Sequence, residues 1–357
     1  MMRSRLPLYL AGVYTLLVLY ASLHPFSGWR DSGIEPFTFL NAAWPRYFTH
    51  FDLGVNALAY LPLGFLWAAV LSRSVAPLLA VLLATLGTAG FSFGIEALQN
   101  YLPSRVPSNL DFASNASGAF LGALLSLRWG RDLLDGGRLH AWRQRRFLHG
   151  PNGDFGLVLV ALWLLTQLNP ETILFGNGNL RSLLGLPAAL PFAAEDFQVL
   201  EMASVAAQTW AIALIATRLA ANHPLLLPPV LVLAALAVKS LALLVLMHGD
   251  RGLAWATPGS LGGLGLGLLL WIAVMPLPAA LRQALAALAL MFAAVLANLM
   301  PDNPYLEDTL RTWQQGHFFN FNGLTRLATA LWPFFALPWL MLSRSRNATR
   351  NLYDHYH

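Results

Sequence analysis

The side chains best suited to chemistry form three pairs at the edges of apolar stretches. Each pair joins a carboxylic acid to an amide three or four residues later: Asp52 with Asn56, Glu96 with Gln99, and Asp111 with Asn115. A basic residue, Arg105, lies between the second and third pairs. Residues at these spacings share a helix face, so both members of a pair would meet the same neighbour.

This chemistry predicts a site for a polar ligand. Three carboxylic acids accompany one arginine, so the cluster stays negative unless a carboxyl is protonated or a cationic group binds. The alternative interpretation is a set of interhelical hydrogen bonds that holds three helices together. We favour the ligand site, because ionisable residues inside membranes are usually functional.

The composition indicates that a membrane surrounds these pairs. The chain has 357 residues, of which 57% are hydrophobic and only 11% charged, whereas a soluble domain carries about 25% charged residues. Cysteine is absent, which excludes disulfides, thiolate metal sites and cysteine nucleophiles. The composition therefore predicts an all-α, polytopic transmembrane helix bundle.

Ten apolar runs predict about ten membrane spans, with boundaries near 6–23, 53–72, 76–101, 110–129, 155–169, 199–220, 225–247, 258–276, 279–299 and 324–342. With the N-terminus in the cytoplasm, 14 arginines fall on the cytoplasmic side and 7 on the other. This bias favours that orientation and places both termini in the cytoplasm. All three polar pairs then lie in the outer half of the membrane.

The chain is expected to divide into three parts. Residues 1–129 form a four-span membrane domain, residues 130–154 a basic cytoplasmic connector, and residues 155–357 a six-span region whose role the sequence does not indicate. The connector is interpreted as an ordinary positive-inside loop with an interfacial helix. A patch that docks an anionic lipid or a partner is the alternative.

The order of motifs between residues 50 and 129 resembles the VanZ-like membrane family. The resemblance rests on the three pairs, on Arg105, and on Pro62-Leu63-Gly64, Pro103, Gly118 and Gly122. It implies a multispan membrane protein associated, in the family's named member, with tolerance of the glycopeptide teicoplanin. It implies no known reaction. Gly118 and Gly122 continue the face that carries Asp111 and Asn115, which predicts close helix packing.

The second half contains the only lysine, Lys239, well inside an apolar run. One interpretation is a buried ion pair with Glu201, and the other is a charge for an anionic ligand or a proton relay. Gly259, Gly263 and Gly267 recur every four residues, which predicts a second tightly packed helix pair.

The sequence lacks the H-E-x-x-H and Walker A motifs, so a zinc protease and a P-loop pump lose support. No cofactor, metal or nucleic-acid partner is expected. Arginine outnumbers lysine 21 to 1, which suggests a GC-rich bacterial genome and hence a bacterial cytoplasmic membrane.

Three functions follow from these observations. The favoured one is an envelope protein that binds a polar lipid or a lipid-linked cell-wall precursor in an outer-leaflet pocket. The second is a membrane-embedded hydrolase or transferase that uses Glu96 or Asp111 as a general base. The third is a lipid or glycan translocator, although the two halves show no internal repeat.

Overall fold

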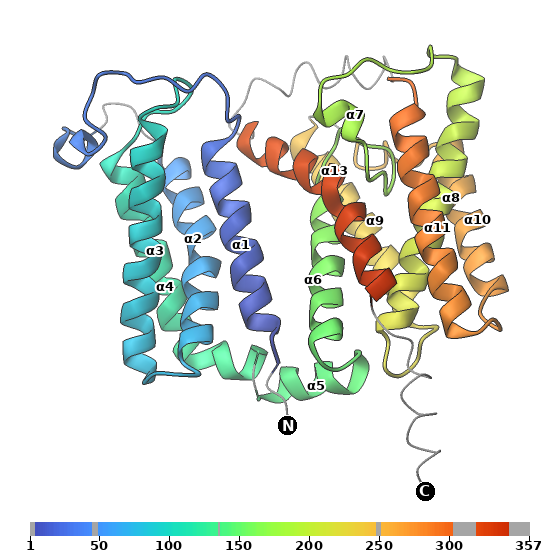
Figure 1. Ribbon diagram of the computed structural model, residues 1–357, viewed down its shortest axis with the longest axis horizontal. Coiled ribbons are helices and arrows are strands. Elements are labelled where there is room, and N and C mark those ends of the chain that lie inside the picture. The colour runs from blue at the N-terminus through green and yellow to red at the C-terminus, as the bar shows by residue number, and fades with distance from the viewer. Residues whose placement is uncertain (1–3, 45–48, 135, 248–250, 303–318, 343–357) are drawn as a thin grey trace, which may run out of the picture. The chain divides into compact units, whose positions relative to one another are not determined.

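The computed structural model describes residues 4–44, 49–134, 136–247, 251–302 and 319–342, and within these ranges every regular element is a helix (Figure 1). An isolated bridge between Phe147 and Ala220 is the only β-type pairing in the described residues. The predicted all-α fold is therefore confirmed. The chain divides into two compact units, Met1–Arg145 and Arg146–His357, and this boundary lies inside the 130–154 segment.

The first unit contains α1 (Leu6–Leu23), the 3-10 helix η1 (Thr38–Asn41), α2 (His50–Leu71), α3 (Pro77–Gln99), α4 (Asn109–Leu134) and most of α5 (Arg138–Arg146). Proline in the first turn of α1 and of α3 suits a position where the backbone N–H has no helical partner. At the start of α2, the Thr49 hydroxyl accepts a hydrogen bond from the Asp52 N–H at 3.0 Å, which is a standard N-cap.

Helices α2 and α4 form the closest helix pair of this unit because glycines remove the side chains between them. A Cβ atom on Gly118 would overlap the backbone oxygen of Ala57, and one on Gly122 would overlap that of Leu61. Gly64 on α2 meets the backbone of α4 in the same way. The predicted close packing at Gly118 and Gly122 is therefore confirmed, and it holds the start of α4 against α2.

The second unit contains α6 (Pro151–Thr166), the short α7 (Leu180–Leu183), α8 (Ala194–Leu219), α9 (Leu227–Leu246), α10 (Pro258–Ala273), α11 (Ala279–Leu299) and α13 (Phe319–Leu342). Helix α8 lies at its centre and packs against α9, α10 and α11. Cβ atoms on Gly259, Gly263 and Gly267 would overlap atoms of α8. The predicted tight packing of this glycine series is confirmed, and its partner is α8.

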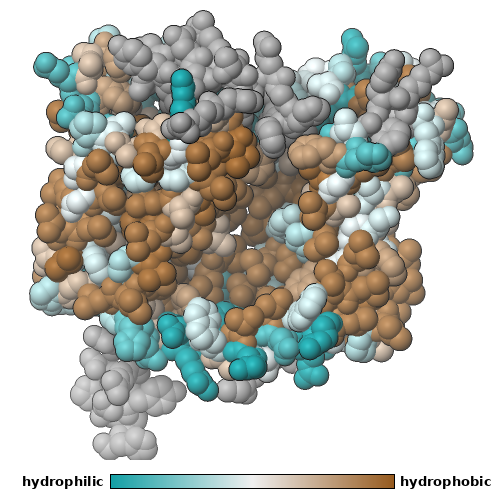
Figure 2. Space-filling model, turned by 180° about the vertical axis from the view of Figure 1, so that it is seen from behind, coloured by the Kyte–Doolittle hydropathy of each residue, from teal (hydrophilic) through white to brown (hydrophobic). Residues whose placement is uncertain are grey.

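The surface of the helices is apolar, as expected for contact with lipid. On α3, Leu78, Leu82 and Leu86 repeat every four residues and are 75%, 53% and 60% exposed. Hydrophobic residues cover much of the face shown in Figure 2, and hydrophilic residues gather towards the helix ends. These long apolar helix faces support a multi-pass membrane protein.

Each of the ten predicted runs corresponds to a helix. Within the described residues, seven helices are long and apolar enough to cross a membrane, namely α1, α2, α3, the helix that begins with α4, α8, α9 and α11. The apolar helices α6 and α10 are shorter, with 16 residues each. The crossing of all ten helices, and their orientation, stay predictions. Arg3, Arg46, Arg311, Arg344, Arg346 and Arg350, which contribute to the predicted orientation, lie outside the described residues.

Candidate functional site

The predicted site residues lie at one end of the first unit. Asp52 and Asn56 belong to the first two turns of α2, Glu96 and Gln99 to the last turn of α3, and Asp111 and Asn115 to the first two turns of α4. Arg105 lies in the link between α3 and α4. The structure therefore brings the polar ends of these three helices together at one end of the unit.

The first contact within the cluster joins α2 to α4. The Asn56 Nδ2 donates a hydrogen bond of 2.8 Å to Asp111 Oδ1. One turn earlier on α2, Asp52 Oδ2 accepts a hydrogen bond of 2.6 Å from the Thr49 hydroxyl. These bonds keep two carboxylates at the same edge of the glycine-packed helix pair.

The second contact joins α3 to the start of α4 through Ser108. Glu96 is only 2% exposed, and its Oε2 accepts a hydrogen bond of 3.0 Å from the Ser108 N–H. The Ser108 hydroxyl accepts a bond from the Asp111 N–H at 3.4 Å. Glu96 thus meets the N-terminus of α4, whose partial positive charge favours a carboxylate.

Arg105 and Gln99 face a different target, the carboxyl end of α1. Arg105 Nη2 donates to the carbonyl of His24 at 2.6 Å and to that of Ala21 at 3.3 Å. Gln99 Nε2 donates to the carbonyl of Ser22 at 2.9 Å. These donors supply hydrogen bonds to carbonyls at a helix end, where intrahelical partners are missing. Both residues therefore hold α1 against the cluster.

Arg105 also interacts electrostatically with the cluster. Burial lowers the pKa of its guanidinium, while the neighbouring Glu96 carboxylate raises it. The arginine consequently combines two tasks: it binds the end of α1, and it places a positive charge near the buried carboxylate.

A deeper layer of polar groups continues the cluster towards the middle of the helices. Asn115 is 6% exposed, and its Nδ2 donates to the Ser92 hydroxyl at 3.0 Å. The Asn115 Oδ1 is buried and has no hydrogen-bond partner among the described residues. Tyr60, which is 3% exposed, lies beside Ser92 and close to Glu96.

Sequence reasoning missed Tyr60, Ser92 and Ser108. A signal was present for two of them, because Tyr60 follows Asn56 by four residues and Ser92 precedes Glu96 by four. Each therefore continues the polar face of its helix by one turn. The cluster as a whole is rich in oxygen acceptors, which suits a ligand that carries hydroxyl, amide or amino donors.

Comparison with known families gives a match for the N-terminal part of the chain. Residues 8–130 match the family model VanZ/LLP1. The N-terminal unit is VanZ-like. The match begins within α1, before the segment on which the resemblance rested, and the VanZ-like unit indeed uses α1 as the partner of Gln99 and Arg105. Neither the curated proteins nor the solved structures gave a match.

The helices from α6 to α13 lie outside the VanZ-like match, and their buried lysine has different partners from those expected. Lys239, 1% exposed, donates to the carbonyl oxygens of Asn169 at 2.6 Å and Thr172 at 2.9 Å. Glu201 instead accepts bonds from Thr257 and Ser260. The predicted pairing of Lys239 with Glu201 is wrong, because a non-helical segment reaches Lys239 from another side.

That segment, residues 167–179, joins α6 to α7 and lies in the interior of the second unit. Its Gln167, Asn169 and Asn177 are each no more than 2% exposed. The Gly178 N–H donates to the carbonyl of Thr329, and its carbonyl accepts from Asn298. Irregular backbone at membrane depth requires such internal partners, so Lys239 stabilises this segment.

Proposed function

We propose that the protein is a bacterial cytoplasmic-membrane protein of the cell envelope whose VanZ-like unit binds a polar lipid headgroup or a lipid-linked cell-wall precursor. The observation that carries this proposal is the Glu96 carboxylate, buried among polar groups from α2, α3 and α4 in an apolar helix bundle. Burying a carboxylate is costly, and ionisable groups within membrane helices usually serve a function.

The ligand is expected to donate hydrogen bonds. Glu96 and Asp111 offer carboxylate oxygens, and the Asn115 Oδ1 is an acceptor without a partner among the described residues. Sugar hydroxyls and peptide amides, which lipid-linked cell-wall precursors carry, match this set of acceptors. The teicoplanin association of the named VanZ-like member supports a ligand from cell-wall synthesis over a bulk lipid.

The residues take distinct roles in this proposal. Glu96 and Asp111 contact the ligand, while Asn56 and Asn115 orient it. Gln99 and Arg105 are positioning residues, because their side chains donate hydrogen bonds to backbone carbonyls at the carboxyl end of α1. If the cluster only held the helices together, removal of the carboxylate charges would have no effect as long as the hydrogen bonds between the helices remained.

Isosteric variants separate these two interpretations. Glu96→Gln keeps an oxygen for the Ser108 N–H, and Asp111→Asn keeps an oxygen for the Asn56 amide, but each removes a negative charge. We expect both variants to keep the wild-type Tm and to retain about tenfold less co-purified lipid-linked precursor, as loss of a charge-assisted hydrogen bond predicts. Native mass spectrometry of the purified protein measures the retained lipid.

Ser117→Ala is the matched control, since Ser117 is exposed on α4 and its hydroxyl bonds to the carbonyl of Ala113 on its own helix. Retention of the precursor by both acid variants at the wild-type level would refute the binding proposal. Cleavage of the bound precursor by wild-type protein but not by Glu96→Gln would replace it with the hydrolase or transferase alternative.

A further inference from the structure

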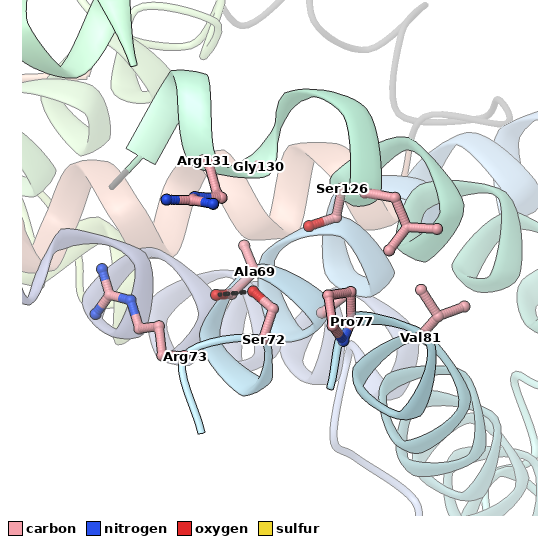
Figure 3. Close-up of a pocket in the computed structure, with 10 residues that line it drawn as sticks. Ala69, Ser72, Arg73, Pro77, Val81, Ser126, Gly130 and Arg131 are labelled. Carbon is pink, nitrogen blue, oxygen red and sulfur yellow. Dashed lines mark hydrogen bonds between the residues drawn. The ribbon is translucent and has the colours of Figure 1, made fainter. Parts of the chain in front are cut away.

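The VanZ-like unit contains a cavity of about 340 Å³ between the end of α2, the start of α3 and the second half of α4. Figure 3 shows Arg73 and Arg131 reaching it from different walls, with Ser72 and Ser126 nearby. Asp52 lies about 30 Å from this cavity, since 20 residues of α2 separate it from Ser72. The cavity is therefore distinct from the Glu96 cluster and lies towards the other membrane surface.

One part of the cavity wall, at Gly130, carries no side chain. Gly130 on α4 is buried, and a Cβ atom there would lie 2.6 Å from the Ser126 Oγ and 3.6 Å from the Ala69 Cβ. Val81 and Leu127 contribute apolar surface to the remaining wall. The cavity thus combines a polar end with an apolar side, which suits an amphipathic ligand.

The charge of the cavity is positive. Arg73 and Arg131 line it, and its described lining contains no acidic residue. Arg73 Nη1 donates to the carbonyl of Ser4 at 2.8 Å, which fixes this guanidinium in place. The Arg131 guanidinium makes no hydrogen bond or ion pair within the described part of the chain. The neighbouring Asp132 instead approaches Arg128 at 3.8 Å, outside the cavity.

The backbone around the cavity adds to this preference for an anion. The carbonyl of Ala69 accepts a bond from the Ser72 hydroxyl, and that of Arg131 accepts from Gly136 and Gly137. These two carbonyl acceptors, one near the end of α2 and one near the end of α4, are thus occupied. The first turn of α3 has no side-chain cap, so no side chain offsets the partial positive charge at the N-terminus of this helix.

We propose that this cavity binds a phosphate group, with Arg131 and Arg73 as its principal ligands. Guanidinium groups bind phosphate oxygens with paired hydrogen bonds, and the Ser126 hydroxyl is an additional donor. The predicted orientation places the cavity at the cytoplasmic leaflet, where anionic phospholipids concentrate. A phospholipid headgroup and free inorganic phosphate share this chemistry.

Binding of phosphatidylglycerol to the full chain tests the proposal. The protein in detergent is titrated with phosphatidylglycerol or phosphatidylcholine, and bound lipid is counted by native mass spectrometry. We expect phosphatidylglycerol to bind at least about tenfold more weakly to Arg131→Gln than to wild type, and Arg131→Lys to recover part of the loss. Arg128→Gln, which removes a charge from the same helix outside the cavity, should bind like wild type.

Two further experiments identify the source of the phosphate and distinguish loss of the site from misfolding. If excess inorganic phosphate displaces phosphatidylglycerol, the site is assigned to phosphate itself. If phosphatidylglycerol stays bound in excess phosphate, the site is assigned to the lipid headgroup. Ser126→Leu fills the cavity without changing its charge and should also abolish binding. Equal losses in Arg131→Gln and Arg128→Gln, or undiminished binding in Ser126→Leu at an unchanged Tm, would overturn the proposal.

Discussion

At the residue scale, the polar groups of the VanZ-like unit fall into two classes. Glu96 and Asp111 present carboxylate oxygens between helices, whereas Arg105 and Gln99 direct their donors to the backbone of α1. Mutations in the second class should therefore change stability first and ligand binding only as a consequence. In the proposed function, the first class contacts the ligand and the second class holds the helices together.

Replacing Arg105 tests the structural class. Arg105→Ala removes the donors to the carbonyls of Ala21 and His24, and we expect a loss of about 1.5–3 kcal/mol in the free energy of unfolding. Arg105→Lys should be intermediate, because it keeps one charge but not the fork of donors. Thermal unfolding of the purified protein measures both variants.

The control for this experiment is Arg30→Ala, since Arg30 is exposed and its removal leaves the bonds at the end of α1 intact. A Tm for Arg105→Ala that matches the Arg30→Ala value would show that the contacts to α1 do not stabilise the unit.

The sequence predicts this residue pattern only in part. The spacing of Asn56 and Asp111 and their equal depth foretell the contact between α2 and α4. Ser92 and Tyr60 were missed because a hydroxyl in an apolar helix is common, and only their spacing of four residues from Glu96 and Asn56 marks them. The partners of Arg105 and Lys239 were missed for another reason. Both bind backbone carbonyls of non-adjacent segments, and no side-chain pattern marks such acceptors.

At the element scale, the contact between α2 and α4 depends on glycine more than on any polar bond. Gly118→Ala should destabilise the unit by about 1–3 kcal/mol, because the added methyl group overlaps the Ala57 backbone. Gly90→Ala on α3 is the matched change, since a Cβ atom there meets nothing within 4 Å. It should be neutral or stabilising by about 0.5–1 kcal/mol.

Unfolding of both glycine variants in a mixed detergent series gives the comparison. Similar stabilities for Gly118→Ala and Gly90→Ala would mean that the helices separate easily enough to accept a methyl group, contrary to the close packing described above.

The helices themselves were the most predictable part of the fold. Long apolar runs indicate helices directly, because an isolated backbone in lipid must satisfy its own hydrogen bonds. The buried segment 167–179 was not foreseen. It follows a short apolar run and contains polar residues, and this composition is equally typical of an external loop.

At the scale of the whole molecule, orientation decides which leaflet each proposed ligand comes from. The chain has no cysteine, so a single introduced thiol reports one position without background. Ser104 and Ser74 are both exposed and lie in links at opposite ends of α3. We expect Ser104→Cys to react with an impermeant maleimide in intact spheroplasts, and Ser74→Cys to react only after permeabilisation.

The labelling result bears on both proposed sites. Labelling of Ser74→Cys alone in intact spheroplasts would invert the predicted orientation, moving the Glu96 cluster to the cytoplasmic side and the arginine-lined cavity to the outer side. The contacts within each site would be unchanged, but a cell-wall precursor would have to be bound before it leaves the cytoplasmic leaflet.

The glycine contact between α2 and α4 also limits how the VanZ-like unit can move. With backbone against backbone, these two helices can neither slide nor part without losing most of their contact, so they behave as one rigid body. Helix α3 has no comparable anchor, since Cβ atoms on its Gly87, Gly90 and Gly94 meet nothing within 4 Å. We therefore expect a displacement of α3 to admit a ligand to Glu96, and such a movement would break the hydrogen bond between Ser108 and Glu96.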